Sequence, residues 1–335
     1  MLLIGLPGLE LGAAERAWLG DPAVSGVILF ARNFRDGAQL GALVAAIRGA
    51  AGRPLLLAVD QEGGPVQRLR GEGFTDLPPL AAIGALHRED PERARLAARL
   101  HARVMATELR RAGLDLSLAP VADLARGNRA IGERAFAADP EVCAGLVTAY
   151  VAGMAEAGMA ATLKHFPGHG SIAEDSHDET ACDPRPLAAF REEDWRPFRA
   201  GIAAGAAAVM MAHLVCPALG DGRPAGASPP VVARLREELG FAGIVMSDDL
   251  AMAGNAMLGA LPARVAAHRE AGCELILVCR PEQVPEALRA AARLPPVEPE
   301  RLARLAATGA SARGEAELRE DRAMLAALLD TRRRP

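Results

Sequence analysis

Short apolar runs that follow glycine residues recur along this chain of 335 residues, and the repeat limits what the chain can fold into. A Gly just past a helical pattern is the usual stop signal of a helix. Near-continuous apolar runs are typical of parallel strands that are buried on both faces. Ala-Gly pairs at 112–113, 157–158, 204–205, 242–243 and 271–272 each precede such a run: Leu114–Leu118, Met159–Leu163, Ala206–Met211, Ile244–Met246 and Leu275–Val278.

Three further runs, Leu2–Leu6, Val27–Phe30 and Leu55–Val59, bring the number of expected strands to eight. Helical patterns separate the runs. Asp90-Pro91 and Asp139-Pro140 each supply an N-cap and a first-turn proline. Further helices are expected at 36–50, 187–204, 229–239, 260–271 and 281–292, and two closing helices at about 298–330.

Eight strands that alternate with helices predict an α/β fold, a (β/α)8 barrel of the TIM type. A doubly wound open sheet is the alternative, but no G-x-G-x-x-G motif follows a strand. No linker rich in Pro, Gly or Ser divides the chain. We therefore expect residues 1–335 to form a single domain.

Composition excludes several classes of protein. A net charge of −4 leaves no basic footprint for nucleic acid. Five cysteines without paired spacing are typical of a reducing compartment. The first residues lack the features of a signal peptide, and the apolar stretch 201–219 indicates a helix end and a buried strand. We expect a cytoplasmic protein with no membrane contact and no obligate protein partner.

Polar residues gather at the carboxyl ends of six predicted strands, which is where (β/α)8 barrels carry their active sites. All six ends would face one shared mouth, so their joint pattern is more informative than any single motif. The six segments are Phe30–Asn33, Asp60–Glu62, Ala122–Asp123, Lys164–His165, Ala212–His213 and Ser247–Asp249.

Lys164 and the loop after it are the strongest candidates for chemistry. Lys164 is the only lysine in a chain rich in Arg, which favours a need for a compact ammonium group. Asp175 precedes His177 by two residues, a spacing that suits a carboxylate orienting an imidazole for proton transfer. A loop histidine beside an unrelated acid is the alternative.

Ser247-Asp248-Asp249 ends another predicted strand. A carboxylate there can act as a nucleophile, a metal ligand or an acceptor for substrate hydroxyls. Adjacent strand residues point in opposite directions, so only one of the two acids should face the mouth. The other should cap the next segment, unless both acids are caps.

An alternative hypothesis is that His165, His169 and His177 bind a metal ion. Pro167 and Gly168 break any helix between the first two, so their spacing does not place both on one helical face. We therefore predict neither a metal nor a cofactor.

Charged residues in two other loops are candidates for substrate binding. Asp60 can accept hydrogen bonds from vicinal sugar hydroxyls, and Arg68 follows in the same loop. Asn128-Arg129 and Arg134 lie in a loop on the same side, where arginines can clamp a polar substrate. Surface salt bridges are the alternative for each arginine.

Four motifs together resemble glycoside hydrolase family 3 and, within it, the single-domain bacterial β-N-acetylhexosaminidases. The similarity runs from about Val27 to Cys279, and the family fold is a (β/α)8 barrel. The motifs are Asp60-Gln61-Glu62-Gly63-Gly64-x-Val66-x-Arg68-Leu69, Lys164-His165-Phe166-Pro167-Gly168-His169-Gly170, Asp175-Ser176-His177 and Ser247-Asp248-Asp249-Leu250-x-Met252.

The resemblance implies a role for each matching residue. Asp248 would be the nucleophile, and His177, held by Asp175, the general acid and base. The loop from Phe166 to Asp178 would be mobile. The sugar would be bound by Asp60, Arg68, Arg134, Lys164 and His165.

The resemblance also implies an activity. The chain would be a retaining exo-β-N-acetylglucosaminidase that removes terminal N-acetylglucosamine from muropeptides in cell-wall recycling. Alternatives are a family-related phosphorylase, a metal-dependent hydrolase that uses His165, His169, His177 and Asp248, and a catalytically silent glycan-binding barrel. Two departures from the family are a Pro-rich segment at 225–229 and few aromatic residues for sugar stacking.

Overall fold

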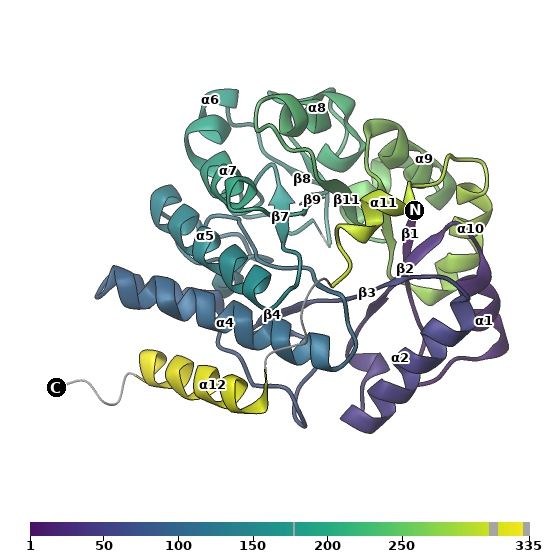
Figure 1. Ribbon diagram of the computed structural model, residues 1–335. Coiled ribbons are helices and arrows are strands. Elements are labelled where there is room, and N and C mark those ends of the chain that lie inside the picture. Colours follow the sequence, from purple (N-terminus) through teal and green to yellow (C-terminus); the bar gives the residue numbers. More distant parts are fainter. Residues whose placement is uncertain (177, 308–313, 331–335) are drawn as a thin grey trace.

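All eight apolar runs overlap with strands in the computed structural model, which describes residues 1–176, 178–307 and 314–330 (Figure 1). The strands are β1 (Leu2–Gly5), β2 (Val24–Leu29), β3 (Leu56–Val59), β6 (Leu116–Ser117), β7 (Thr162–Phe166), β9 (Ala208–Met211), β11 (Ile244–Asp249) and β12 (Leu275–Val278). Their order around the sheet is β6-β3-β2-β1-β12-β11-β9-β7, and each pairing is parallel. Isolated parallel bridges, Leu116 with Ala160 and Val121 with Lys164, join β6 to β7. The predicted (β/α)8 barrel is confirmed.

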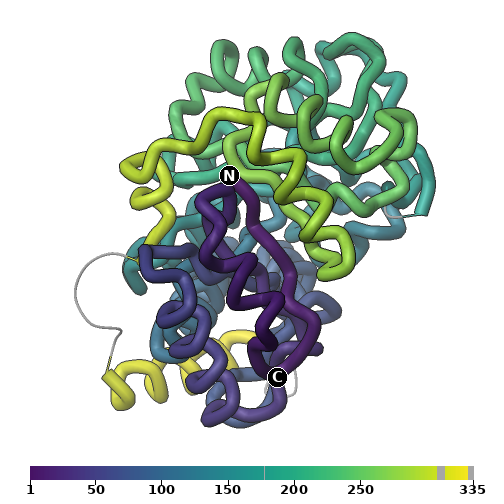
Figure 2. Tube along the Cα trace, turned by 90° about the vertical axis from the view of Figure 1, so that its right-hand side faces the viewer, coloured from purple at the N-terminus to yellow at the C-terminus, as the bar shows by residue number. Residues whose placement is uncertain are grey.

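Alternate strand residues point into the barrel and towards the surrounding helices, which explains the continuous apolar runs. In β1, Leu3 belongs to the interior cluster, whereas Leu2 and Ile4 belong to the larger cluster beneath the helices. The first and last strands, β1 and β12, pair with each other, so the purple N-terminal segment lies beside a yellow-green part of the chain in Figure 2.

The helices surround this ring, and aspartate caps begin the two longest predicted ones. Asp90 accepts hydrogen bonds from the backbone at the start of α4, and Asp139 does so at the start of α5. The helices are α1 (Ala13–Gly20), α2 (Gly37–Ala51), α3 (Leu80–His87), α4 (Pro91–Arg111), α5 (Pro140–Glu156), α6 (Leu187–Ala189), α7 (Trp195–Ala203), α8 (Pro229–Glu237), α9 (Leu261–Ala271), α10 (Val284–Ala291), α11 (Pro299–Ala303) and α12 (Glu315–Leu329). Short strand pairs β4 (Gln61–Gly63) with β5 (Val66–Gln67), and β8 (Ala181–Cys182) with β10 (Leu214–Val215), lie outside the barrel sheet.

Helices α11 and α12 close the molecule at two different places. Leu305, just after α11, belongs to the cluster inside the barrel, and Arg301 donates to Gly243 O at the entry of β11. Helix α11 therefore covers the end of the barrel where the strands begin. Helix α12 packs on α4, where Asp321 accepts from Arg103 Nε at 2.7 Å.

The structure differs from the predictions in a few places. Helices α1 and α3 were not predicted, β6 has two residues instead of five, and β11 extends to Asp249. The segment 281–292 begins with a 3-10 turn, Pro281–Gln283, before α10. Within the described ranges, none of the helices combines the length and the apolar content that a membrane span requires.

Candidate active site

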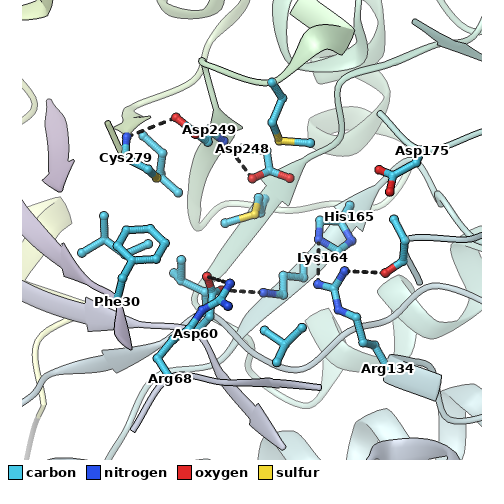
Figure 3. Close-up of a pocket in the computed structure, with 17 residues that line it drawn as sticks. Phe30, Asp60, Arg68, Arg134, Lys164, His165, Asp175, Asp248, Asp249 and Cys279 are labelled. Atoms are coloured by element: carbon cyan, nitrogen blue, oxygen red, sulfur yellow. Dashed lines mark hydrogen bonds and ion pairs between the residues drawn. The ribbon is translucent and has the colours of Figure 1, made fainter. Parts of the chain in front are cut away.

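A cavity of about 350 Å³ opens at the carboxyl ends of the barrel strands (Figure 3). Four of the six strand ends that were expected to share one mouth contribute lining residues, whereas Ala122–Asp123 and Ala212–His213 do not line the cavity. His177, one of the eight predicted site residues, lies outside the described residues. The other seven all line the cavity: Asp60, Arg68, Arg134, Lys164, His165, Asp175 and Asp248. Asp249, the neighbour of the predicted nucleophile, lines it as well.

Lys164 lies in β7, and only 2% of its side chain is exposed. Its Nζ donates to Asp60 Oδ1 at 2.9 Å and lies 2.6 Å from Glu62 Oε1. Burial alone would lower the pKa of Lys164, but the Asp60 and Glu62 carboxylates raise it above its ordinary value. The ammonium group therefore stays charged, and these two contacts leave it a third N–H donor.

Arg134 is the last residue of a 3-10 turn, Gly132–Arg134, and forms a bidentate pair with Glu62. Arg134 Nε and Nη2 donate to Glu62 Oε2 and Oε1, each at 2.8 Å. Burial would raise the pKa of Glu62, but Arg134 and Lys164 hold it well below its ordinary value. Because a two-point contact fixes the plane of a guanidinium group, Glu62 sets the orientation of Arg134.

His165 is oriented by the buried carboxylate of Asp123. Asp123 Oδ2 lies 2.7 Å from His165 Nδ1, and Asp123 Oδ1 accepts from the backbone N–H of His169 at 2.7 Å. Burial would raise the pKa of Asp123, but His165 and these hydrogen bonds keep it below its ordinary value. An ionised carboxylate only accepts, so we assign the proton of neutral His165 to Nδ1. Its Nε2 is then an acceptor, 3.5 Å from Arg134 Nη2.

Asp248 and Asp249 occupy the end of β11 and differ in what surrounds them. Asp249 Oδ1 accepts from the backbone N–H groups of Cys279 at 3.1 Å and Ala251 at 3.2 Å, so this carboxylate caps neighbouring backbone. Figure 3 shows Asp249 turned towards Cys279 and Asp248 towards His165. His213 lies behind them, with Nε2 2.9 Å from Asp249 O.

Asn128 supports the loop that carries Asp175 into the cavity. Asn128 Oδ1 accepts from Ala130 N and Ile131 N, which orients the amide group. Its Nδ2 donates to Ile172 O and Glu174 O, both at 2.8 Å. Asn128 therefore supports the site without lining the cavity. Neighbouring Arg129 instead forms an exposed ion pair with Glu179, as the surface alternative predicted.

The same loop is attached to two other parts of the barrel mouth. His169 Nε2 lies 2.7 Å from Ser176 Oγ, and Gly254 N donates to Ser176 O at 3.0 Å. A Cβ atom at Gly170 would lie 1.8 Å from Leu124 O, so this approach requires glycine. These contacts hold the segment before Asp175 between the loops that follow β6 and β11.

Arg68 lies on the side of the cavity opposite the Asp175 loop (Figure 3). Its Nη2 is 3.6 Å from Asp60 Oδ2, and its guanidinium carbon lies 5.7 Å from the centre of the Phe30 ring. Phe30 thus gives this end of the cavity an apolar wall beside a cation.

A family model of the glycosyl hydrolase family 3 N-terminal domain matches residues 4–303. The chain belongs to glycosyl hydrolase family 3. A β-hexosaminidase from Stenotrophomonas maltophilia is 59% identical over 291 residues, which cover 87% of this chain and 86% of that relative. This family 3 chain is therefore an enzyme, a glycoside hydrolase of the β-hexosaminidase type, as predicted.

Solved structures of family 3 proteins have the same barrel fold as this chain. The crystal structure of native NagZ from Neisseria gonorrhoeae has a TM-score of 0.89 and 37% identity, and the match covers 98% of this chain and 97% of that one. NagZ from the same organism in complex with N-trifluoroacetyl-D-glucosamine has a TM-score of 0.88 and 37% identity, with 98% of each chain covered.

Three supporting residues of this family 3 site were given no role from the sequence: Glu62, Asp123 and Asn128. Glu62 and Asp123 stand at strand ends, which was the available signal. Their partners are remote in sequence: Arg134 is 72 residues from Glu62, and His165 is 42 residues from Asp123. Sequence spacing therefore did not show which group each one orients.

The alternative metal site includes His177, which lies outside the described residues. The His165 and His169 rings lie 6.3 Å apart, and both have protein partners. Outside His177 and the other undescribed positions, no group of three His, Cys, Asp or Glu residues is arranged to hold a metal ion.

Proposed function

We propose that this family 3 enzyme is a retaining exo-β-N-acetylglucosaminidase that releases terminal N-acetylglucosamine from peptidoglycan fragments. The observation that carries the proposal is the placement of Asp248 in one cavity with Asp60, Lys164 and Arg134. A carboxylate opposite a set of fixed donors and acceptors suits the attack on a bound sugar. The N-trifluoroacetyl-D-glucosamine complex of the related NagZ supports the choice of sugar.

Asp248 is the nucleophile of the proposed reaction. Its carboxylate oxygen bonds to the anomeric carbon as the bond to the leaving oxygen breaks, and His177 gives that oxygen a proton. In the second step His177 takes a proton from water, and the water oxygen replaces Asp248 on the anomeric carbon. Two displacements restore the original configuration.

Asp175 is the partner of His177 in this proposal. A carboxylate on one ring nitrogen orients an imidazole and stabilises its cationic form. The position of Asp175 in the cavity wall supports this role.

Five residues bind the sugar in the proposed complex. Lys164, Arg134 and Arg68 donate hydrogen bonds to hydroxyl and carbonyl oxygens of the substrate. Asp60 and His165 Nε2 accept hydrogen bonds from its hydroxyl groups. Removal of one terminal sugar fits a cavity of about 350 Å³ at the mouth of the barrel.

The biological setting is part of the proposal. The enzyme acts in the cytoplasm on muropeptides during cell-wall recycling, as a single catalytic domain of residues 1–335 whose last helices, at about 298–330, close the barrel. It needs no cofactor, nucleic acid, membrane or obligate protein partner.

The test is turnover of nitrophenyl β-N-acetylglucosaminide beside nitrophenyl β-glucoside, with the first sugar product followed by NMR. We expect strong preference for the acetamido sugar and initial release of the β-anomer. Preference for the glucoside, or an α-anomer as the first product, would contradict the proposal. No hydrolysis of either compound together with tight sugar binding would identify a silent glycan-binding barrel.

Two controls separate the alternative chemistries. A phosphorylase would yield the sugar 1-phosphate when phosphate is added, whereas we expect free sugar with and without phosphate. A metal-dependent hydrolase would lose activity in excess chelator and regain it with zinc or manganese, whereas we expect no change.

A further inference from the structure

Two cations, Arg134 and Lys164, meet at one place in the cavity wall. Neighbouring Arg and Lys side chains commonly bind phosphate or carboxylate groups, because their donors converge and their charges add. The substrate proposed above offers uncharged hydroxyl groups at this point. Another group of the protein must therefore determine that this pair of cations binds hydroxyl groups and not anions.

Glu62 contacts both cations from the protein interior. Only 1% of its side chain is exposed, and it does not line the cavity. One Glu62 oxygen contacts both Arg134 Nη2 and Lys164 Nζ, at 2.8 and 2.6 Å, and the other accepts from Arg134 Nε. Asp60 also contacts Lys164, so two carboxylates offset the charges of Arg134 and Lys164. The other Asp60 oxygen lies 3.6 Å from Arg68 Nη2.

The geometry also removes the donor pair that an anion would use. The Nε and Nη2 edge of Arg134, which can grip a carboxylate or phosphate at two points, is occupied by Glu62. Arg134 Nη1 donates one hydrogen to Ala130 O at 2.9 Å. Two N–H hydrogens remain on Arg134, one on Nη1 and one on Nη2, which lies 3.5 Å from His165 Nε2, and one remains on Lys164. Each can donate singly to a hydroxyl oxygen.

We propose that Glu62 is a specificity-determining residue, which holds Arg134 and Lys164 as donors to neutral sugar hydroxyls and prevents the pair from binding anions. The proposal rests on the assignment of the cavity as a sugar site. Glu62 acts through the two cations and does not touch the substrate, so its role is positioning and neutralisation.

The main test is Glu62→Gln, which keeps the shape of the side chain and removes its charge. Binding of N-acetylglucosamine and of inorganic sulfate is measured by calorimetry, with ionic strength held constant by sodium chloride because screening weakens charge interactions. We expect sugar affinity to fall by about tenfold to a hundredfold, the range for a lost charge-assisted hydrogen bond. We expect sulfate affinity to rise by at least about tenfold, since an unneutralised cation then faces the cavity.

Glu108→Gln is the matched control. Glu108 has a side chain that is 1% exposed and pairs with Arg322, but it lies between α4 and α12, away from the cavity. This variant removes a buried glutamate charge without touching the site. We expect it to change stability and to leave both binding constants as in the wild type.

Glu62→Asp separates charge from geometry and covers the case in which Glu62→Gln does not fold. The shorter acid keeps the charge and loses the two-point contact, so sulfate should remain excluded while sugar affinity falls. In the wild type, sulfate should bind at least about tenfold more weakly than in Glu62→Gln.

The result that would overturn the proposal is unchanged sulfate affinity in Glu62→Gln, whatever happens to the sugar. Sulfate binding to the wild type or to Glu62→Asp as tight as that of N-acetylglucosamine would also overturn it. Failure of the wild type to bind N-acetylglucosamine would contradict the proposed function instead. The sulfate comparison still tests anion exclusion by Glu62 in that case.

Discussion

Three side chains in the cavity wall depend on polar groups that lie behind them. Glu62 orients Arg134, Asp123 orients His165, and Asn128 supports the loop of Asp175. Removing one member of a buried ion pair commonly costs about 3–5 kcal/mol, because the other charge stays buried without a partner. Rigid placement of the cavity residues thus depends on side chains that do not line the cavity.

Residues that line the cavity were easier to predict than those that support them. Lys164, Asp60 and Asp248 stand at strand ends, and that position alone indicated a shared mouth. The bidentate pair of Glu62 with Arg134 depends on how two loops meet across 72 residues of sequence. A single sequence carries no local pattern for such a contact.

His177→Ala tests proton transfer at the scale of one residue. Protonation matters most for a poor leaving group such as a sugar alkoxide, and an activated phenolate leaves with little help. We therefore expect His177→Ala to slow cleavage of a natural disaccharide by about 10²–10⁴-fold and cleavage of a nitrophenyl glycoside far less. The measurement is kcat/KM for both substrates.

Asp175→Ala should show the same pattern more weakly, because Asp175 only orients the imidazole and supports its charge. Equal losses on both substrates in His177→Ala would mean that His177 binds the substrate or shapes the site.

At the scale of elements, the barrel strands were predictable because burial on both faces makes them apolar throughout. Helices α1 and α3 were not, and neither has a side-chain hydrogen bond at its N-cap, Gly12 or Pro79. Asp90 and Asp139, by contrast, mark the starts of α4 and α5 in the sequence and in the structure. An aspartate N-cap in the sequence thus made the starts of α4 and α5 predictable, whereas α1 and α3 have no such signal.

Helix α5 offers a matched pair of glycines that tests its packing on α4. A Cβ atom at Gly153 would lie 2.2 Å from Arg99 O, whereas one at Gly145 would meet only Arg95 Nε, at 4.0 Å. We expect Gly153→Ala to lower the free energy of unfolding by about 1–3 kcal/mol, since it forces the helices apart. Gly145→Ala should raise it by about 0.5–1 kcal/mol through helix propensity.

Urea unfolding of both variants checks this prediction. Equal effects of the two substitutions would contradict the close helix contact at Gly153.

At the scale of the whole molecule, buried histidines should make stability depend on pH. Burial lowers the pKa of His101 to about 4, that of His213 to about 4 and that of His268 to about 3. The unfolded chain therefore binds more protons than the folded one between about pH 6.5 and pH 4. The stability they contribute is present above pH 6.5 and is lost as the pH falls towards 4.

Each of these histidines should add a slope of about 1.4 kcal/mol per pH unit in that window. Urea unfolding at a series of pH values measures the slope. His101→Asn should reduce the slope by the contribution of one proton, about 1.4 kcal/mol per pH unit. The free energy of unfolding should fall further below about pH 4.5, where Glu62 and Asp123 take up protons on unfolding. A constant free energy of unfolding between pH 7 and pH 5 would contradict this account.

The most direct test of the central claim is to trap the glycosyl-enzyme and find the residue that carries the sugar. A fluorinated N-acetylglucosaminyl donor that reacts faster than its intermediate is hydrolysed would leave a stable label, to be located by peptide mass spectrometry. We predict a label on Asp248, no label in Asp248→Ala, and a detectable label in Asp249→Ala, because Asp249 caps the backbone of Cys279 and Ala251. A label on Asp249, or full turnover of natural substrate by Asp248→Ala, would contradict the assignment of Asp248 as the nucleophile.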